Sequence, residues 1–452
     1  MPRSIRSRVL SRQHRNPSLK RPRTDSLTTS SAPGPSATLE DWLDYHQRLN
    51  PRRIELGLGR TRAVLDALEL ERPDLTITVA GTNGKGSSVA MLDALLREPR
   101  KPVGAFTSPH LIRYNERIAL DGAPVDDATI IAAFQRIEAV RGDVPLTYFE
   151  ASALAALAVF ADAGVAVALL EVGLGGRLDA VNAVSADGML ITSIDLDHQS
   201  WLGDTREAIG AEKAGVLRGG APAVFSGNDM PDSVAEVAAQ VGTPLWVAGR
   251  DYSVGRHRDG HWQFESALLT LVDLPPLTLT GDHQIANAAG VIALLARLGR
   301  LPDDAADRLS RVAVAGRFQR LSGRPPWILD VAHNPASAAA LAATLRREPC
   351  QGRTLALVGM LADKDLEAAI GSLDDVVDDW FAMPIESPRA LPPLDLAQRI
   401  AAVTNRPCAW FDAQPTALQA VRELANSADR IVVFGSFHAV GPALATLRGR
   451  RV

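Results

Sequence analysis

The seven residues 81–87 (GTNGKGS) constrain the fold of this chain more than any other stretch. They follow an apolar, β-branched run at 75–80 and precede a helical pattern at 86–97. A strand, a glycine loop and a helix in this order hold phosphate, because the loop N–H groups and the helix N-terminus both face the anion. Lys85 can neutralise a β- or γ-phosphate, and a nearby hydroxyl can reach Mg²⁺. The sequence therefore predicts a nucleotide-binding loop within an α/β fold.

This loop departs from the regular Walker A pattern at two positions. Val79 stands where the first glycine is expected, and Gly86 stands where Ser or Thr follows the lysine. The alternative interpretation is a glycine-rich turn at a strand end. The strand before the loop and the helix after it favour nucleotide binding.

The length of 452 residues predicts two domains. A net charge of −4 gives no reason to expect a nucleic-acid partner or an anionic membrane, and no apolar run reaches the length of a membrane span. Cys350 and Cys408 offer neither a disulfide framework nor metal-ligand spacing. These features predict a cytoplasmic enzyme without a membrane anchor.

Residues 1–38 differ from the rest of the chain. Eight Arg and Lys residues precede the first acid, Asp25, and Ser and Pro are frequent. Such a segment cannot bury enough apolar surface to offset its ordering entropy, so we expect a disordered basic tail. An organelle transit peptide, a nucleic-acid-binding arm and a dispensable extension are the alternatives.

Strand and helix patterns alternate from Thr38 onward, where Thr38 and Asp41 predict a capped helix start. We expect two α/β domains: an ATP-binding P-loop domain at 39–312, with a mostly parallel sheet flanked by helices, and a smaller Rossmann-like domain at 313–452. An antiparallel addition is expected at 250–275. Predicted strands are 75–80, 165–171, 189–194, 327–330, 354–358, 380–383 and 430–434, and predicted helices include 86–97, 127–141, 149–162, 336–346 and 416–425.

Polar side chains follow three of the predicted strands. Ser108, Glu171 and His198 each stand just beyond an apolar run, at the sheet edge where open α/β folds bind ligands. Taken singly, Ser108 could cap a turn, Glu171 could pair with Arg177, and His198 could be a hydrogen-bonded loop residue. Together with the phosphate loop they predict a Mg²⁺ site beside the nucleotide.

Three further charged residues fall near the predicted domain boundary or on a helix. By spacing alone, Lys213 is a solvated helix lysine. Arg317 and Asp330 would face the first domain across a cleft, where a basic side chain could complete a phosphate site on domain closure. The residues thus indicate an ATP-dependent, Mg²⁺-requiring enzyme, and they do not name its acceptor.

Nine ordered blocks between Leu39 and Val440 carry a family likeness. The chain resembles the folylpolyglutamate synthase and dihydrofolate synthase family, in the muramyl-ligase-like group of ATP-dependent amide ligases, and looks most similar to its bifunctional bacterial branch. The blocks are VAGTNGKGSSVAML (79–92), TSPHLIRYNERI (107–118), LTYFEASALAAL (146–157), LEVGLGGRLDAVN (170–182), TSIDLDHQSWLGDTREAIGAEKAGV (192–216), AGRFQRL (315–321), ILDVAHNP (328–335), VGMLADKD (358–365) and VFGSFHAVG (433–441).

The resemblance implies a role for each matching residue. Ser108 and Glu171 would ligate a first Mg²⁺, and His198 a second. Lys213 would be carbamylated by CO₂, which reverses the interpretation from spacing. His333 would help to place L-glutamate. The ATP site would comprise Thr82, Asn83, Gly84, Lys85, Gly86, Ser87, Asn287, Arg317 and Asp330, and the pterin pocket would comprise Thr147, Tyr148, Phe149, Glu150, Leu178, Asp179 and Ala180.

The activity implied is ATP-dependent ligation of L-glutamate to dihydropteroate and to folates through an acyl phosphate, with Lys85, Lys213, His198 and Arg317 in catalytic roles. The partners would be these small molecules, with no nucleic acid and no membrane, and the chain would be a monomer. A monofunctional folylpolyglutamate synthase, a muramyl-peptide ligase and a P-loop ATPase without ligase activity are the alternatives.

Overall fold

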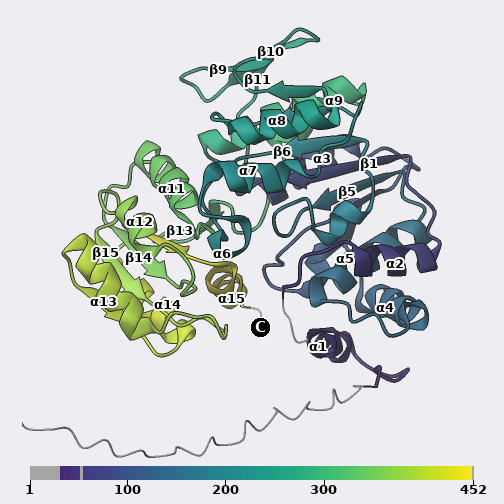
Figure 1. Ribbon diagram of the computed structural model, residues 1–452. Coiled ribbons are helices and arrows are strands. Elements are labelled where there is room, and N and C mark those ends of the chain that lie inside the picture. The colour runs from purple at the N-terminus through teal and green to yellow at the C-terminus, as the bar shows by residue number, and fades with distance from the viewer. Residues whose placement is uncertain (1–30, 51–53, 450–452) are drawn as a thin grey trace, which may run out of the picture.

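The apolar run at 75–80 forms β1 (Leu75–Ala80), an inner strand of an eight-stranded sheet in a computed structural model of the chain. The structure describes residues 31–50 and 54–449 (Figure 1). The strand order is β4-β3-β2-β5-β1-β6-β7-β8, and all strands run in one direction except β3, which is antiparallel to both of its neighbours, β2 and β4. The other strands are β2 (Val103–Phe106), β3 (Ile118–Leu120), β4 (Ala123–Pro124), β5 (Val167–Glu171), β6 (Gly188–Ile191), β7 (Ala223–Phe225) and β8 (Leu245–Val247).

Helices cover both faces of this sheet, which explains why all six residues of β1 are buried. Ile77 and Val79 pack on the face that carries α3 and α9, whereas Ala80 packs on the opposite face. The first face holds α3 (Lys85–Leu96), α9 (Asp282–Leu298) and α10 (Ala305–Ser310), and the second holds α1 (Leu39–Leu49), α2 (Gly59–Leu68), α4 (Asp127–Arg141), α5 (Tyr148–Asp162), α7 (Arg206–Ala214) and α8 (Asp232–Val241).

A second sheet of six strands lies beside the first (Figure 1). Its order is β12-β13-β17-β14-β15-β16, parallel except for β12. Helices α11, α12 and α13 cover one face, and α14 and α15 cover the other. The elements are β12 (Gln319–Leu321), β13 (Trp327–Leu329), α11 (Pro335–Arg347), β14 (Thr354–Val358), α12 (Leu366–Gly371), β15 (Asp379–Ala382), α13 (Pro393–Thr404), β16 (Cys408–Trp410), α14 (Gln414–Leu424), β17 (Arg430–Phe434) and α15 (Phe437–Leu447).

The two sheets are joined by close packing at one loop. Leu111 and Ile112, from the segment after β2, pack against the apolar cluster around α15. A Cβ atom on Gly441 of α15 would lie 1.8 Å from the carbonyl oxygen of Leu111, so only glycine permits this approach. The division at 312–313 falls between α10 and β12, and it stays a prediction.

The α/β class and the helix and strand types are confirmed, with shifts at element ends. The strand expected at 165–171 begins at Val167, because the N–H of Val165 still bonds the carbonyl of Phe160 in the turn after α5. The strand expected at 189–194 spans Gly188–Ile191. The 250–275 region forms a separate antiparallel sheet of β9 (Tyr252–Arg256), β10 (Trp262–Ser266) and β11 (Thr270–Leu274).

The first helix begins as the sequence predicts. The Thr38 side chain accepts from the N–H of Asp41, and the Asp41 carboxylate accepts from the N–H of Thr38. Most of the predicted tail, residues 1–30, lies outside the described residues. Among the described residues, no helix is long and apolar enough to cross a membrane.

His46 on α1 is a polar side chain in an apolar aromatic cluster. It is 1% exposed, its ring centroid lies 4.5 Å from that of Phe134, and neither ring nitrogen has a partner within the described part of the chain. Burial, together with the charge of Arg141, lowers its pKa from 6.5 to about 3. The other ionisable groups nearby are Tyr45 and Glu138, which bond each other. The folded protein therefore keeps this imidazole neutral.

Replacing His46 with leucine is expected to raise the free energy of unfolding by about 1–3 kcal/mol, because two unsatisfied polar atoms leave the core. The unfolded imidazole takes up a proton below pH 6.5 and the folded one only near pH 3. The free energy of unfolding of the wild-type protein should thus fall by about 1.4 kcal/mol per pH unit below pH 6.5. The free energy of unfolding of the leucine variant should fall less over the same pH range. Urea unfolding at pH 7.5 and 5.5 measures both effects. An equal loss of stability between pH 7.5 and pH 5.5 in the wild-type protein and the variant would contradict a buried, neutral His46.

Candidate active site

The phosphate loop leads from β1 into α3 with glycines at two critical positions. Gly84 precedes α3 and has a φ of 88°, a backbone conformation that glycine adopts readily and that other residues rarely adopt. A Cβ on Gly81 would lie 1.8 Å from the Thr192 hydroxyl oxygen. That hydroxyl donates to the carbonyl of Asn83 at 2.6 Å, so Thr192, just beyond β6, anchors the loop. The loop is thereby held open toward a cavity.

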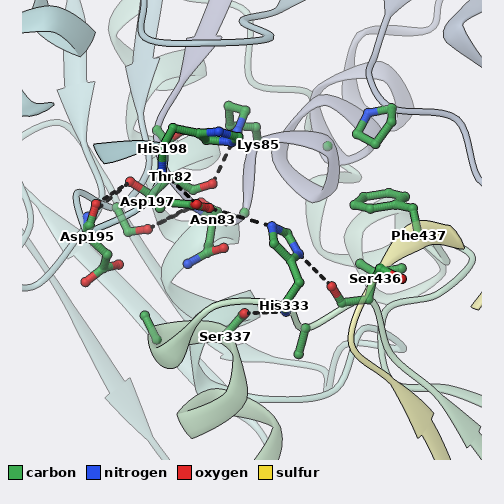
Figure 2. Close-up of a pocket in the computed structure, with 18 of the residues that line it drawn as sticks. Thr82, Asn83, Lys85, Asp195, Asp197, His198, His333, Ser337, Ser436 and Phe437 are labelled. Carbon is green, nitrogen blue, oxygen red and sulfur yellow. Dashed lines mark hydrogen bonds and ion pairs between the residues drawn. The ribbon is translucent and has the colours of Figure 1, made fainter. Parts of the chain in front are cut away.

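The cavity, of about 460 Å³, lies between the two sheets (Figure 2). Loop residues Thr82, Asn83 and Lys85 face His333, Ser436 and Phe437 from the second sheet. The predicted residues that line this cavity are Thr82, Asn83, Gly84, Lys85, Gly86, Ser87, Ser108, Glu171, His198, Lys213, Arg317, Asp330 and His333. The fold thus brings together side chains from distant parts of the sequence, and the bonded pair Asn83 and Asn334 is 251 positions apart.

Two buried donors in this cavity have no partner among the described residues. The hydroxyl of Ser87 and Nη1 of Arg317 are both unsatisfied, and the Arg317 guanidinium lies 5.2 Å from the Phe437 ring centroid. Asp330 beside it accepts from the N–H groups of Phe318 and Ala332. An anion with several oxygens would satisfy these donors. The arrangement fits a polyphosphate.

Two lysines converge on one backbone carbonyl. Lys85 Nζ donates to the carbonyl oxygens of Gly81 and Thr82 at 3.1 and 3.2 Å, and Lys213 Nζ donates to that of Gly81 at 2.9 Å. Lys213 is 5% exposed, so the interpretation from spacing, a solvated lysine, is wrong. Burial and the charge of Lys85 lower the pKa of Lys213 to about 7. The tertiary fold has turned this face of α7 inward against the loop.

Glu171 ends β5 beside the phosphate loop. It accepts from the N–H of Ser108 at 3.1 Å, and burial raises its pKa although Lys85 opposes this. The alternative pairing with Arg177 is wrong, because Arg177 pairs with Glu212 at 2.9 Å. Glu171 and Ser108 offer two oxygen ligands beside a phosphate site, the number that Mg²⁺ commonly takes from protein. Their chemistry fits Mg²⁺.

His198 precedes the short helix α6 (Gln199–Leu202) at φ 53°. Burial lowers its pKa to about 4, so its ring is neutral and able to bind a metal. No group of three His, Cys, Asp or Glu side chains suited to a metal occurs among residues 31–50 and 54–449. A second Mg²⁺ beside His198 and an unmodified Lys213 would meet nitrogen ligands, which suit it poorly. A carbamate on Lys213 would supply oxygen.

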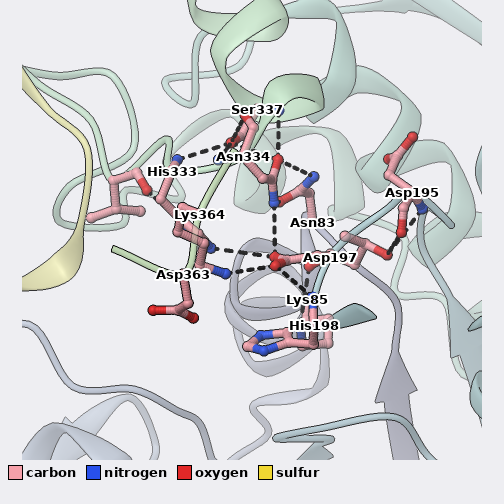
Figure 3. A network of polar contacts seen from close by, with 12 residues as sticks. Asn83, Lys85, Asp195, Asp197, His198, His333, Asn334, Ser337, Asp363 and Lys364 are labelled. Carbon is pink, nitrogen blue, oxygen red and sulfur yellow. Dashed lines mark hydrogen bonds and ion pairs between the residues drawn. The ribbon is translucent and has the colours of Figure 1, made fainter. Parts of the chain in front are cut away.

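A network missed by residue-level prediction joins the two sheets (Figure 3). Asp197 pairs with Lys364 at 2.6 Å and accepts from the Asn334 amide at 3.1 Å, while Asn334 also exchanges hydrogen bonds with Asn83. Burial alone would raise the pKa of Asp197, but His333 and Lys364 hold it well below its usual range. The blocks at 192–216, 328–335 and 358–365 contained these residues, and only their contacts reveal the link.

A second cavity, of about 1070 Å³, adjoins the first. Asp179 stands at its wall, where its carboxylate accepts from the N–H groups of Gly173, Leu174 and Val181, and burial raises its pKa to about 6. Phe149 lies against Gly173, since a Cβ there would meet its ring at 2.4 Å. The residues predicted for the pterin pocket that line it are Thr147, Phe149, Glu150, Leu178, Asp179 and Ala180.

Three predicted site residues do not offer a free side chain to the cavity for which they were predicted. Tyr148 lines neither cavity, and its ring packs against Tyr114 with a centroid distance of 6.0 Å. Glu150 reaches the second cavity, but its carboxylate already binds Arg60. Asn287 is buried behind the phosphate loop, where a Cβ on Gly84 would lie 2.6 Å from its Oδ1. Tyr148 and Asn287 therefore support the walls without lining either cavity, whereas Glu150 lines the second cavity with its carboxylate already paired.

Arg117, absent from the predicted set, is an unusual cation in the second cavity. It is 8% exposed, and its guanidinium lies 5.5 Å and 5.6 Å from the ring centroids of Tyr114 and Tyr148. Its Nε donates to Nδ1 of His110 at 2.9 Å. No carboxylate pairs with it among the described residues, and it lines the cavity. A buried unpaired guanidinium indicates an anionic ligand.

Comparison with known proteins gives consistent matches. Residues 316–437 match the family model of the Mur ligase, glutamate ligase domain. The dihydrofolate synthase/folylpolyglutamate synthase of Escherichia coli (strain K12) is 40% identical over 424 residues, covering 93% of this chain and 98% of that protein. The solved structure of E. coli FolC in complex with DHPP and ADP has a TM-score of 0.88 at 39% identity, covering 93% of this chain and all of the other. A bifunctional folylpolyglutamate synthase/dihydrofolate synthase with Mn, AMPPNP and L-glutamate bound has a TM-score of 0.85 at 40% identity, covering 92% and 100%.

Proposed function

The chain belongs to the dihydrofolate synthase/folylpolyglutamate synthase family, and on that premise we propose how its own residues carry out the ATP-dependent ligation of L-glutamate to dihydropteroate and to folates. The observation that supports this assignment is the adjoining pair of cavities. One is built on the phosphate loop, and the other has an aromatic wall and a buried unpaired arginine. Ser108 and His198 line both cavities, so a carboxylate in the second can meet a phosphate in the first.

The ligation proceeds in two steps. An oxygen of the acceptor carboxylate attacks the γ-phosphorus of ATP, and the bond from that phosphorus to the β-phosphate oxygen breaks. The products are an acyl phosphate and ADP, which is the leaving group. The amine of L-glutamate then attacks the acyl carbon, expels inorganic phosphate and loses a proton. Lys85 and Arg317 stabilise the charge that develops on the phosphates, while Arg117 holds the acceptor carboxylate.

Ser108 and Glu171 are proposed to hold a first Mg²⁺, and His198 with carbamylated Lys213 a second. Bound Mg²⁺ would neutralise phosphate charge. His333, whose Nδ1 lies 2.8 Å from the carbonyl oxygen of Val331, is proposed to help place L-glutamate. The link from Asp197 to Lys364 closes the two domains over the site, which protects an acyl phosphate from water. We further propose a cytoplasmic monomer.

The direct test is phosphate release by the purified protein with ATP and Mg²⁺, offering dihydropteroate and a tetrahydrofolate separately. We expect phosphate release with each of the two acceptors, and we expect that release to require L-glutamate. Release with tetrahydrofolate alone would leave a monofunctional folylpolyglutamate synthase and remove the pterin role of Phe149 and Asp179. Hydrolysis without glutamate would overturn the ligase assignment.

Carbamylation of Lys213 is testable on its own. Its amine is buried without a carboxylate partner in the described structure, and like His198 it lines the first cavity. Attack of the amine on CO₂ forms a C–N bond and releases a proton. Activity should fall several-fold in CO₂-depleted buffer and recover with bicarbonate, and ¹³CO₂ should yield a carbamate NMR signal that is absent in Lys213→Met. Full activity without CO₂ and no such signal would contradict the carbamate.

A further inference from the structure

The incoming L-glutamate brings two carboxylates to the site, and a site that binds it needs cations for them. Among the described residues, two basic side chains line both cavities: Lys364 and Arg389, in the loops that follow β14 and β15 of the second sheet. They stand where a glutamate amine would have to approach an acyl phosphate formed at the junction. Which of the two is available for a substrate carboxylate follows from their existing contacts.

Lys364 is already neutralised. Its Nζ lies 2.6 Å from Oδ1 of Asp197, and the side chains are 7% and 9% exposed. Figure 3 shows this pair within the network that joins the two sheets. If Lys364 moved from Asp197 to a substrate, the buried Asp197 carboxylate would lose its counter-charge. The free energy of that loss exceeds the free energy that a contact between Lys364 and a substrate carboxylate would contribute. Its charge therefore serves the domain contact.

Arg389 retains free donors. Its Nη1 lies 3.2 Å from Oδ2 of Asp363, with the side chains 53% and 44% exposed. No other described residue accepts a hydrogen bond from its guanidinium. An ion pair this exposed contributes little, so a carboxylate can join or displace Asp363 at small cost. A guanidinium can also hold a carboxylate through two parallel hydrogen bonds.

The backbone of Arg389 is held in place by the segment that carries Lys364. Its carbonyl accepts from the N–H of Ala362 at 2.8 Å, and Ala390 forms an isolated β-bridge with Leu361. This pairing ties the Arg389 loop to the segment that carries Lys364, and so to the Asp197 link. The cation is thus positioned at the junction whenever the domain contact is made.

We propose that Arg389 binds a carboxylate of the incoming L-glutamate, an assignment that rests on the proposed ligase function. Kinetics of Arg389→Met and Arg389→Lys test it, with Arg346→Met as the matched control. Arg346 forms a similarly exposed pair with Asp375, with exposed fractions of 47% and 59%, and lines neither cavity. The measurements are KM for L-glutamate, for dihydropteroate and for ATP, each with the other two substrates saturating.

Arg389→Met should raise KM for L-glutamate about 10- to 100-fold while KM for ATP and dihydropteroate stays within about twofold. Arg389→Lys should recover part of the loss, and Arg346→Met should behave as wild type. An unchanged glutamate KM, or a rise for dihydropteroate instead, overturns the assignment. Because the wild-type protein is measured alongside, absence of glutamate-dependent turnover there would refute the ligase function itself.

Discussion

Replacing Lys85 with methionine is expected to lower kcat/KM for ATP about 100- to 1000-fold. Its Nζ lies at the phosphate loop on the carbonyl oxygens of Gly81 and Thr82, in the first cavity. Methionine keeps most of the side-chain volume and removes the charge that would offset the phosphates. Steady-state phosphate release with dihydropteroate and L-glutamate measures the loss.

Lys101→Met is the matched control for Lys85. Lys101 is an exposed lysine that pairs with Glu98 on the surface and lines neither cavity. It should change activity by less than about twofold, and both variants should unfold near the wild-type temperature. Comparable activity of the Lys85 variant and wild type would show that the loop does not bind the transferred phosphate.

Replacing Arg117 with methionine is expected to lower kcat/KM for dihydropteroate about 30- to 5000-fold, the range for loss of one partner of a buried charge pair. The guanidinium is held between Tyr114 and Tyr148 and oriented by His110. Burial, with the charge of Arg117, lowers the pKa of His110 to about 4, which keeps a lone pair free to accept. The arginine is therefore positioned before any ligand arrives.

The control for this variant is Arg113→Met in the same segment. Arg113 pairs with Asp127 at 3.0 Å on the surface, with exposed fractions of 68% and 52%. It should leave catalysis unchanged. Binding of a fluorescent ATP analogue should be equal in both variants, because Arg117 lines only the second cavity. Equal losses for Arg113 and Arg117, or weakened nucleotide binding by Arg117→Met, would contradict a role in holding the acceptor.

Both predictions concern residues from sequence blocks, yet only one was predicted as a site residue. Lys85 lies in the glycine loop, where the spacing alone indicates contact with phosphate. Arg117 lies in the TSPHLIRYNERI block beside Arg113, and nothing in the local sequence distinguishes the two. Their difference is burial: 8% of Arg117 is exposed, and Arg113 has a surface partner. Burial of one arginine and not the other depends on α5, which supplies Tyr148.

Local sequence determined those features that depend on neighbouring residues. The alternation of apolar runs and helical patterns predicted the α/β class, and the glycine loop between β1 and α3 predicted a phosphate site, because strand, turn and helix preferences act over a few residues. The capped start of α1 at Thr38 has the same local origin. Tertiary structure alone decided the burial of Lys213, the charge pair of Asp197 with Lys364, and the free donors of Arg389. These features depend on which distant side chains the fold brings together and which it leaves exposed, and no local pattern encodes that arrangement.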